Sequence, residues 1–309
     1  MTIGAGLGIA NFPFADAAGF WEWVELCDAN GVDSIWQSDR IIGADPNLEC
    51  LSVMAALAGR TKNLKFGMNV ASLSLRDPVI TAKACATIDV LSDGRLLPAF
   101  GLGSARSRDY TATGTPTRGR GKRAAEGLEI LSRLWSEESV TFKGEFFELT
   151  AASISPRPLQ QPLPLWVGGS AKQAIHRTAK WGTGWQAGLS SPAEVGPVIA
   201  AIKDTLPQYD RQIDEDHYGA GFAFRFGDPD EPICRKYHEL LSTRLGKDAT
   251  QLSAIGGVEE MMRLLLSFHE VGVHKFILRP IAADTPEYID QTQRFITALL
   301  PEIRRLNQR

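Results

Sequence analysis

Two glycines and a serine, Gly168, Gly169 and Ser170, end an apolar run, and a helical pattern over residues 171–180 begins directly after them. Free backbone amides at the start of a helix bind anions, and the helix dipole adds to the attraction. These three residues, which we call the glycine–serine turn, therefore predict a phosphate site. The alternative is an ordinary tight turn in which Ser170 serves only as the helix N-cap.

A second glycine pair, Gly101 and Gly103, ends another apolar run. Because glycine has no side chain, a planar ring can lie directly against the backbone at such a place. The segment begins like a dinucleotide-binding fingerprint, but Arg106 stands where the third glycine is required. The pattern therefore argues against a Rossmann fold and favours contact with a flat ligand.

Residues 106–123, which we call the basic stretch, contain six cations and one acid. A run of this kind can hold the anionic tail of a cofactor or substrate, or guide an external electron donor. The alternative is a solvated loop that leads into a helix, and we expect this for at least half of its residues.

Two charged residues follow apolar runs and are candidates for catalysis. Asp39 comes just after residues 33–37, where a carboxylate can accept a hydrogen bond from a cofactor ring or transfer a proton. The alternative is that Asp39 only forms an ion pair with Arg40. Arg279 ends the last apolar run and can bind a substrate anion, or it can pair with an acidic neighbour for structural reasons.

Other chemistries lack their residue patterns. The histidines show no HExxH spacing, so no metal centre is expected. No GxSxG motif is present, which argues against a serine hydrolase. The four cysteines contain no CxxC pair, so neither a zinc ribbon nor a disulfide framework is expected, and a reducing compartment fits.

Short apolar runs alternate with amphipathic helical patterns along the whole chain, which is typical of βα units around a parallel sheet. The predicted strands are residues 3–9, 33–37, 64–70, 95–101, 163–167, 184–187, 221–226 and 275–279. Eight units predict an α/β fold, a (β/α)8 TIM barrel, with residues 1–309 as a single domain. Residues 137–162, with a candidate hairpin, and 228–250 are the expected insertions. In this fold the chemistry takes place at the carboxyl ends of the strands.

The composition sets the class of protein. The chain has 309 residues, 44% of them hydrophobic, and a net charge of −3. It can therefore bury a large core, and it is not expected to bind nucleic acid. The N-terminus lacks a signal-peptide pattern and no run of 18 apolar residues occurs, so we expect a cytoplasmic protein that does not bind membranes. Its expected partners are a small-molecule substrate and a second copy in a homodimer.

Four segments together resemble the luciferase-like superfamily of flavin- and deazaflavin-dependent oxidoreductases. They are Gly31-Val32-Asp33-Ser34-Ile35-Trp36 with Asp39, Arg76-Asp77-Pro78 through Ala86-Thr87-Ile88-Asp89-Val90-Leu91-Ser92-Asp93-Gly94-Arg95, Gly101-Leu102-Gly103, and Trp166-Val167-Gly168-Gly169-Ser170 continuing to Gly184-Trp185. The second segment is the most specific.

The resemblance implies FMN or coenzyme F420 at the barrel mouth, and a reaction that oxidises or reduces a small organic substrate. It places a bulge with a cis peptide between Asn69 and Val70 under the ring, and the cofactor phosphate on the glycine–serine turn. The strand-end residues Asp39, Gly101 and Gly103 complete the predicted cofactor-binding set. A separate flavin reductase or F420 reductase is an implied partner.

The sequence departs from the family at two places. Many deazaflavin-using relatives have Asp-His where this chain has Asp39-Arg40, so a histidine acid or base is lost there. The family also commonly has an aromatic residue and then a glutamate after the glycines of the fourth strand, where this chain has residues 104–109 instead. Two alternatives stay open: a cofactor-free barrel lyase or isomerase, which requires a lysine or paired carboxylates at strand ends, and a non-catalytic flavin-binding subunit.

Overall fold

Parallel strands pair edge to edge around a closed ring in the computed structural model, which describes residues 2–246 and 248–308. The strands of the ring are β1 (Gly4–Ile9), β2 (Ser34–Gln37), β3 (Lys65–Met68), β4 (Ala71–Ser72), β5 (Leu96–Leu97), β6 (Ala99–Gly101), β9 (Trp166–Gly168), β10 (Gly184–Gln186), β11 (Tyr218–Ala220), β12 (Ala223–Phe226) and β14 (Lys275–Pro280).

Three of the eight strand positions are interrupted. β3 and β4 form the third, β5 and β6 the fourth, and β11 and β12 the seventh. β3 pairs with β5 and β4 with β6, so the third and fourth positions stay neighbours across both interruptions. β14 pairs with β1 on one side and with β11 and β12 on the other, which closes the ring. The predicted (β/α)8 barrel is confirmed.

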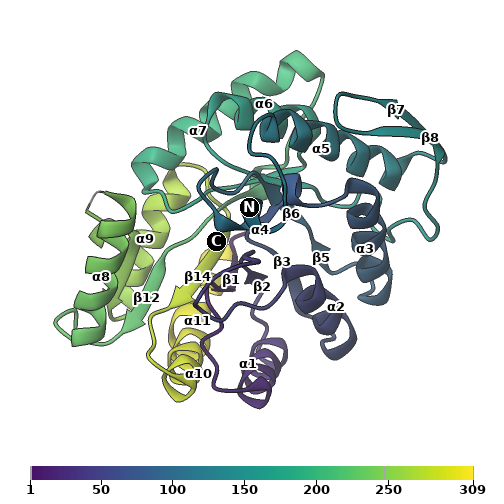
Figure 1. The fold of residues 1–309 in the computed structure, drawn as a ribbon. Helices are drawn as coiled ribbons and strands as arrows, with labels where there is room; N and C mark the ends of the chain where they lie inside the picture. Colours follow the sequence, from purple (N-terminus) through teal and green to yellow (C-terminus); the bar gives the residue numbers. More distant parts are fainter. Residues whose placement is uncertain (1, 247, 309) are drawn as a thin grey trace.

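Helices surround the ring (Figure 1). They are α1 (Ala17–Ala29), α2 (Cys50–Arg60), α3 (Pro78–Leu91), α4 (Arg108–Ala112), α5 (Arg120–Ser136), α6 (Lys172–Trp181), α7 (Pro192–Thr205), α8 (Pro232–Leu245), α9 (Val258–Glu270), α10 (Thr285–Arg294) and α11 (Leu300–Asn307). Several of the helices begin with a side-chain cap. At α3, for example, the Asp77 carboxylate accepts from the amides of Val79 and Ile80, and Pro78 occupies the first turn.

The segments between the regular βα units have structure of their own. The candidate hairpin is confirmed as β7 (Val140–Lys143) paired with β8 (Glu148–Ala152). Residues 228–250 contain α8, and they lead to β13 (Ser253–Gly256), a strand that the sequence analysis missed. Pro301 lies in the first turn of the last helix. A π-helical segment, Phe295–Leu299, precedes this proline, and the helix continues to Asn307.

Glycines and large side chains share the barrel interior. In β1 the alternation of glycine with Ala5, Leu7 and Ile9 directs the apolar side chains outward to the helices. Inside, Trp36 and Trp166 meet edge to face with ring centroids 6.0 Å apart. A Cβ on Gly184 would lie 2.6 Å from the Trp166 ring. Glycine at that strand position is therefore what lets the indole fill the core.

None of the helices formed by residues 2–246 and 248–308 has the length and apolar character required to cross a lipid bilayer.

Candidate functional site

Val70 forms a platform at the carboxyl end of the barrel. The peptide between Asn69 and Val70 is cis, as expected. The Val70 side chain is partly exposed and packs on the cluster of Trp36 and Trp166. A Cβ on Gly101 would lie 2.8 Å, and one on Gly168 3.0 Å, from Val70 Cγ2. These two glycines therefore make room for Val70. The sequence predicts that a flat ligand lies against the backbone at Gly101, but the Val70 side chain occupies that space.

A buried ion pair fixes the segment that follows Val70. The Arg76 guanidinium donates to both carboxylate oxygens of Asp39, at 2.7 and 2.8 Å. The amide of Ser72, two residues after Val70, donates to the same carboxylate at 2.8 Å. Only 3% of the Asp39 side chain is exposed. Burial lowers the pKa of Arg76, but the contact with Asp39 outweighs it and raises that pKa above its usual range.

The predicted partner of Asp39 is wrong. Arg40 pairs with Asp45 at 3.1 Å, on the surface. The arginine that neutralises Asp39 lies far along the chain, at the start of the family-like segment from residue 76. Because both Asp39 oxygens already accept hydrogen bonds, this carboxylate is better suited to position Val70 than to transfer protons. Its proposed direct contact with a cofactor ring stays a prediction.

The glycine–serine turn is held from the neighbouring strand. The indole of Trp185 in β10 donates to the carbonyl of Gly169 at 2.8 Å. In a trans peptide the C=O and N–H groups point in opposite directions, so the Ser170 amide points away from Trp185. Ser170 does not cap the next helix. The N-cap of α6 is Ala171, which makes no side-chain capping bond. The start of α6 therefore keeps its attraction for an anion.

The first turn of α5 lies against the Gly101–Gly103 loop. Arg120 donates to the carbonyl of Gly103 at 2.6 Å and to that of Leu102 at 3.2 Å. Gly103 has φ +62°, and a Cβ there would lie 2.6 Å from the Ser72 hydroxyl, so both its conformation and its space require glycine. The N-cap of α5, Gly119, makes no side-chain capping bond. The basic stretch thus forms α4 and the start of α5 rather than one continuous loop.

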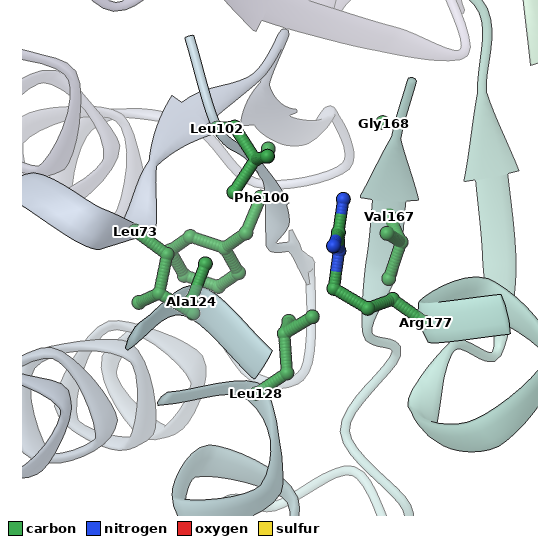
Figure 2. Close-up of a pocket in the computed structure, with 9 residues that line it drawn as sticks. Leu73, Phe100, Leu102, Ala124, Leu128, Val167, Gly168 and Arg177 are labelled. Carbon is green, nitrogen blue, oxygen red and sulfur yellow. The ribbon is translucent and has the colours of Figure 1, made fainter. Parts of the chain in front are cut away.

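Arg177 of α6 was not among the predicted site residues. Its guanidinium lines a cavity with about 10 Å³ of room for the centre of a water molecule, together with Gly101, Gly168 and residues of α5. Figure 2 shows the guanidinium rising between Phe100 and Val167 toward Leu102 and Gly168. The residue is 9% exposed. The spacing in the helix could have indicated this residue. Arg177 follows buried Ala174 by three positions, which places both residues on the same face of α6.

Arg279 and Asn69 lie at other strand ends of the same mouth. A Cβ on Gly8 would lie 3.3 Å from Arg279 Cγ, which places this side chain on the inner face of the barrel beside β1. Arg279 is partly exposed, and among the described residues no carboxylate forms an ion pair with it. The structural pairing considered as its alternative is therefore not observed. Asn69 donates its backbone amide to Gln37 at 2.8 Å and keeps a partly exposed side chain.

These features fit a flat cofactor with a phosphate. The partly exposed side chain of Val70 offers an apolar surface on which a ring can pack. The glycine–serine turn offers a backbone amide and a hydroxyl beside the start of α6, which has no side-chain cap. Arg177 adds a buried cation without a hydrogen-bond partner in the described residues.

Comparisons with known proteins identify the family. Residues 4–275 match the family model described as luciferase-like monooxygenase. An uncharacterised protein of Mycobacterium tuberculosis is 35% identical over 161 residues, which are 51% of this chain and 54% of that protein. The chain therefore spans about half the length of that relative.

An F420-dependent glucose-6-phosphate dehydrogenase of Amycolatopsis mediterranei is 27% identical over 303 residues, covering 90% of this chain and 84% of the relative. Among solved structures, an F420-dependent secondary alcohol dehydrogenase in complex with an F420–acetone adduct aligns with a TM-score of 0.82 at 19% identity, covering 98% of this chain and 99% of that one. This structural likeness shows the fold. The family match over most of the chain shows more: the chain belongs to the luciferase-like monooxygenase family, within the superfamily of F420- and flavin-dependent oxidoreductases.

Proposed function

We propose that this chain is an oxidoreductase that binds FMN or coenzyme F420 at the barrel mouth and acts on a small organic substrate. The observation that carries the proposal is the Val70 platform, in which a partly exposed valine after a cis peptide fills the space above Gly101 and Gly168. The family match supports it, because relatives in this superfamily use one of these two cofactors.

In this proposal Val70 and Asn69 lie under the ring, and the glycine–serine turn binds the phosphate. Gly103 and Arg120 keep the neighbouring loop in place through the contacts described above. The bound cofactor supplies either hydride transfer or oxygen activation. The chain itself orients the ring and excludes water from the apolar core beneath it.

Arg279 is the residue that we propose for binding an anionic group of the substrate. It faces the barrel interior, and no carboxylate within the described part of the chain pairs with it. Because both oxygens of Asp39 already accept hydrogen bonds from Arg76, we do not assign proton transfer to Asp39.

A cofactor-free lyase or isomerase is less well supported. Such an enzyme needs a lysine or a pair of free carboxylates at the strand ends. Lys275 instead begins β14, at the opposite end of the barrel, where it forms an ion pair with Asp33. Asp39, the carboxylate predicted for the mouth, is bound to Arg76.

Titration of the purified protein with FMN and with F420, each followed by its fluorescence, tests the proposal. We expect saturable binding of at least one of them at one site per chain, and reduction or oxidation of the bound cofactor when a suitable substrate is found. Absence of binding by both cofactors would reject the proposal. Binding without turnover across a broad panel of alcohols, aldehydes and acids would favour the non-catalytic subunit.

Ser170→Asp is expected to weaken cofactor binding about tenfold. The added carboxylate lies beside the phosphate, and repulsion between like charges at a partly solvated site is worth about 1 to 4 kcal/mol. Ser170→Asn is the matched control, because it has the same shape without the charge. Fluorescence titration of both variants measures the effect, and equal affinities would place the phosphate elsewhere. Gly169 is unsuitable for this test because its φ of +115° strains any side chain.

A further inference from the structure

Arg177 is a buried cation without a counter-charge. Its residue is 9% exposed, and no carboxylate or hydrogen-bond acceptor within the described residues binds its guanidinium. A buried charge of this kind is costly unless something pairs with it. The remaining neighbours on its cavity are apolar side chains, including Phe100, Leu128 and Val167.

The surroundings add to this cost. Burial lowers the pKa of Arg177, and the positive charge of Arg120 lowers it further. One guanidinium nitrogen lies 3.9 Å from where a Cβ on Gly121 would be, in the first turn of α5. Two cations, Arg120 and Arg177, therefore lie together at the first turn of α5, which has no side-chain cap.

Arg177 shares its cavity with one end of the predicted phosphate site. Gly168, the first residue of the glycine–serine turn, lines the same cavity as Arg177. In Figure 2 the guanidinium lies beside Val167 and points along β9 toward Gly168, where that turn begins. A single water fits the cavity but brings no charge. An anion seated on the turn would bring the missing charge.

We infer that Arg177 is a cofactor-binding residue that supplies the counter-charge for a phosphoryl group on the glycine–serine turn. Its side chain reaches the barrel mouth from outside the barrel, between α5 and α6. Arg120 is the second cation at this site. This inference rests on the proposed function. A guanidinium suits the role because its fork of donors matches two phosphate oxygens at once.

The test compares cofactors with and without the phosphoryl group, in Arg177→Met. FMN is paired with riboflavin, and F420 with its deazaflavin core that lacks phosphate and tail. We expect the affinity for the phosphorylated member to fall by about tenfold to a hundredfold, which is the usual worth of a charge-assisted contact. The affinity for the other member should not change. Arg177→Lys should recover part of the loss.

Stability without ligand gives a second readout. Because Arg177→Met removes an unpaired buried charge and keeps an apolar stem, the melting temperature of the ligand-free variant should equal or exceed that of the wild type. A structural arginine would have the opposite effect. The control is Lys180→Met on the same helix, which removes an exposed charge paired with Glu129 and should leave cofactor affinity unchanged.

Each outcome decides the inference. If Arg177→Met loses the same affinity for the phosphorylated and the unphosphorylated cofactor of a pair, Arg177 serves only packing. If its affinity for both is unchanged, Arg177 makes no contact with the phosphoryl group. If wild type binds neither flavin nor deazaflavin, the proposed function fails separately. Inorganic phosphate then serves as the probe: we expect it to raise the melting temperature of the wild type but not of Arg177→Met, and the same response in both proteins would overturn the inference.

Discussion

Asp39→Asn is expected to lower the free energy of unfolding by about 3 kcal/mol, because it leaves the buried Arg76 without its charged partner. Removal of one member of a buried ion pair usually costs about 3–5 kcal/mol. We expect the lower end of this range, since Glu49 remains 3.2 Å from Arg76 and the new amide oxygen still accepts one hydrogen bond. Chemical denaturation followed by tryptophan fluorescence measures the loss.

Asp45→Asn is the matched control for this change. Asp45 makes the same type of ion pair, with Arg40, but its side chain is 61% exposed. Exposed pairs contribute roughly 0–1 kcal/mol, so this variant should unfold almost as the wild type does. The double variant Asp39→Asn/Arg76→Met should be more stable than Asp39→Asn alone, because neither charge is then left buried and unpaired. Similar small losses in both single variants would show that Asp39 does not anchor the segment after Val70.

The result also separates two roles for Asp39. If the carboxylate only positions the platform, cofactor affinity should fall together with stability, and Asp39→Glu or added osmolyte should recover both. If it contacts the cofactor directly, affinity should fall beyond what the loss of folded protein explains. Titration at a temperature well below the melting point of the variant keeps the protein folded, so the two effects are measured independently.

The barrel itself could be predicted from the sequence because its signals are local. Continuous apolar runs mark strands covered on both faces, and the glycine and proline residues between them mark the turns. The cis peptide at Asn69 was expected from the family resemblance. The interruption of the third, fourth and seventh strands was not predicted, because no residue type in these runs marks a break.

The site contacts are harder to predict because they join residues that are distant in the chain. Asp39 meets Arg76 across 37 positions, whereas its neighbour Arg40 points to the surface. Arg177 lies in a helix in which a cation usually faces solvent. Only the packing of α6 against α5 turns it inward, and sequence spacing alone carries that information weakly.

Gly168→Ala is expected to cost about 1–3 kcal/mol of stability, although alanine is small and the position has ordinary backbone angles. The new methyl would lie 3.0 and 3.3 Å from the two Val70 methyl carbons, and a packed barrel core yields little. Gly188→Ala is the matched control, because no atom lies within 4 Å of its added methyl. It should be neutral or slightly stabilising.

A double-mutant cycle with Val70→Ala identifies the cause of that cost. Val70→Ala removes both methyl carbons that Gly168→Ala would strike, so the double variant should lose at least about 1 kcal/mol less than the sum of the two single variants. Urea denaturation of the four proteins gives the coupling energy. Additive losses would mean that Val70 does not occupy the space above Gly168, and the platform would then be wrong. A loss smaller than that sum would establish that Val70, rather than bare glycine backbone, forms the surface on which the ring of a flat cofactor is proposed to rest.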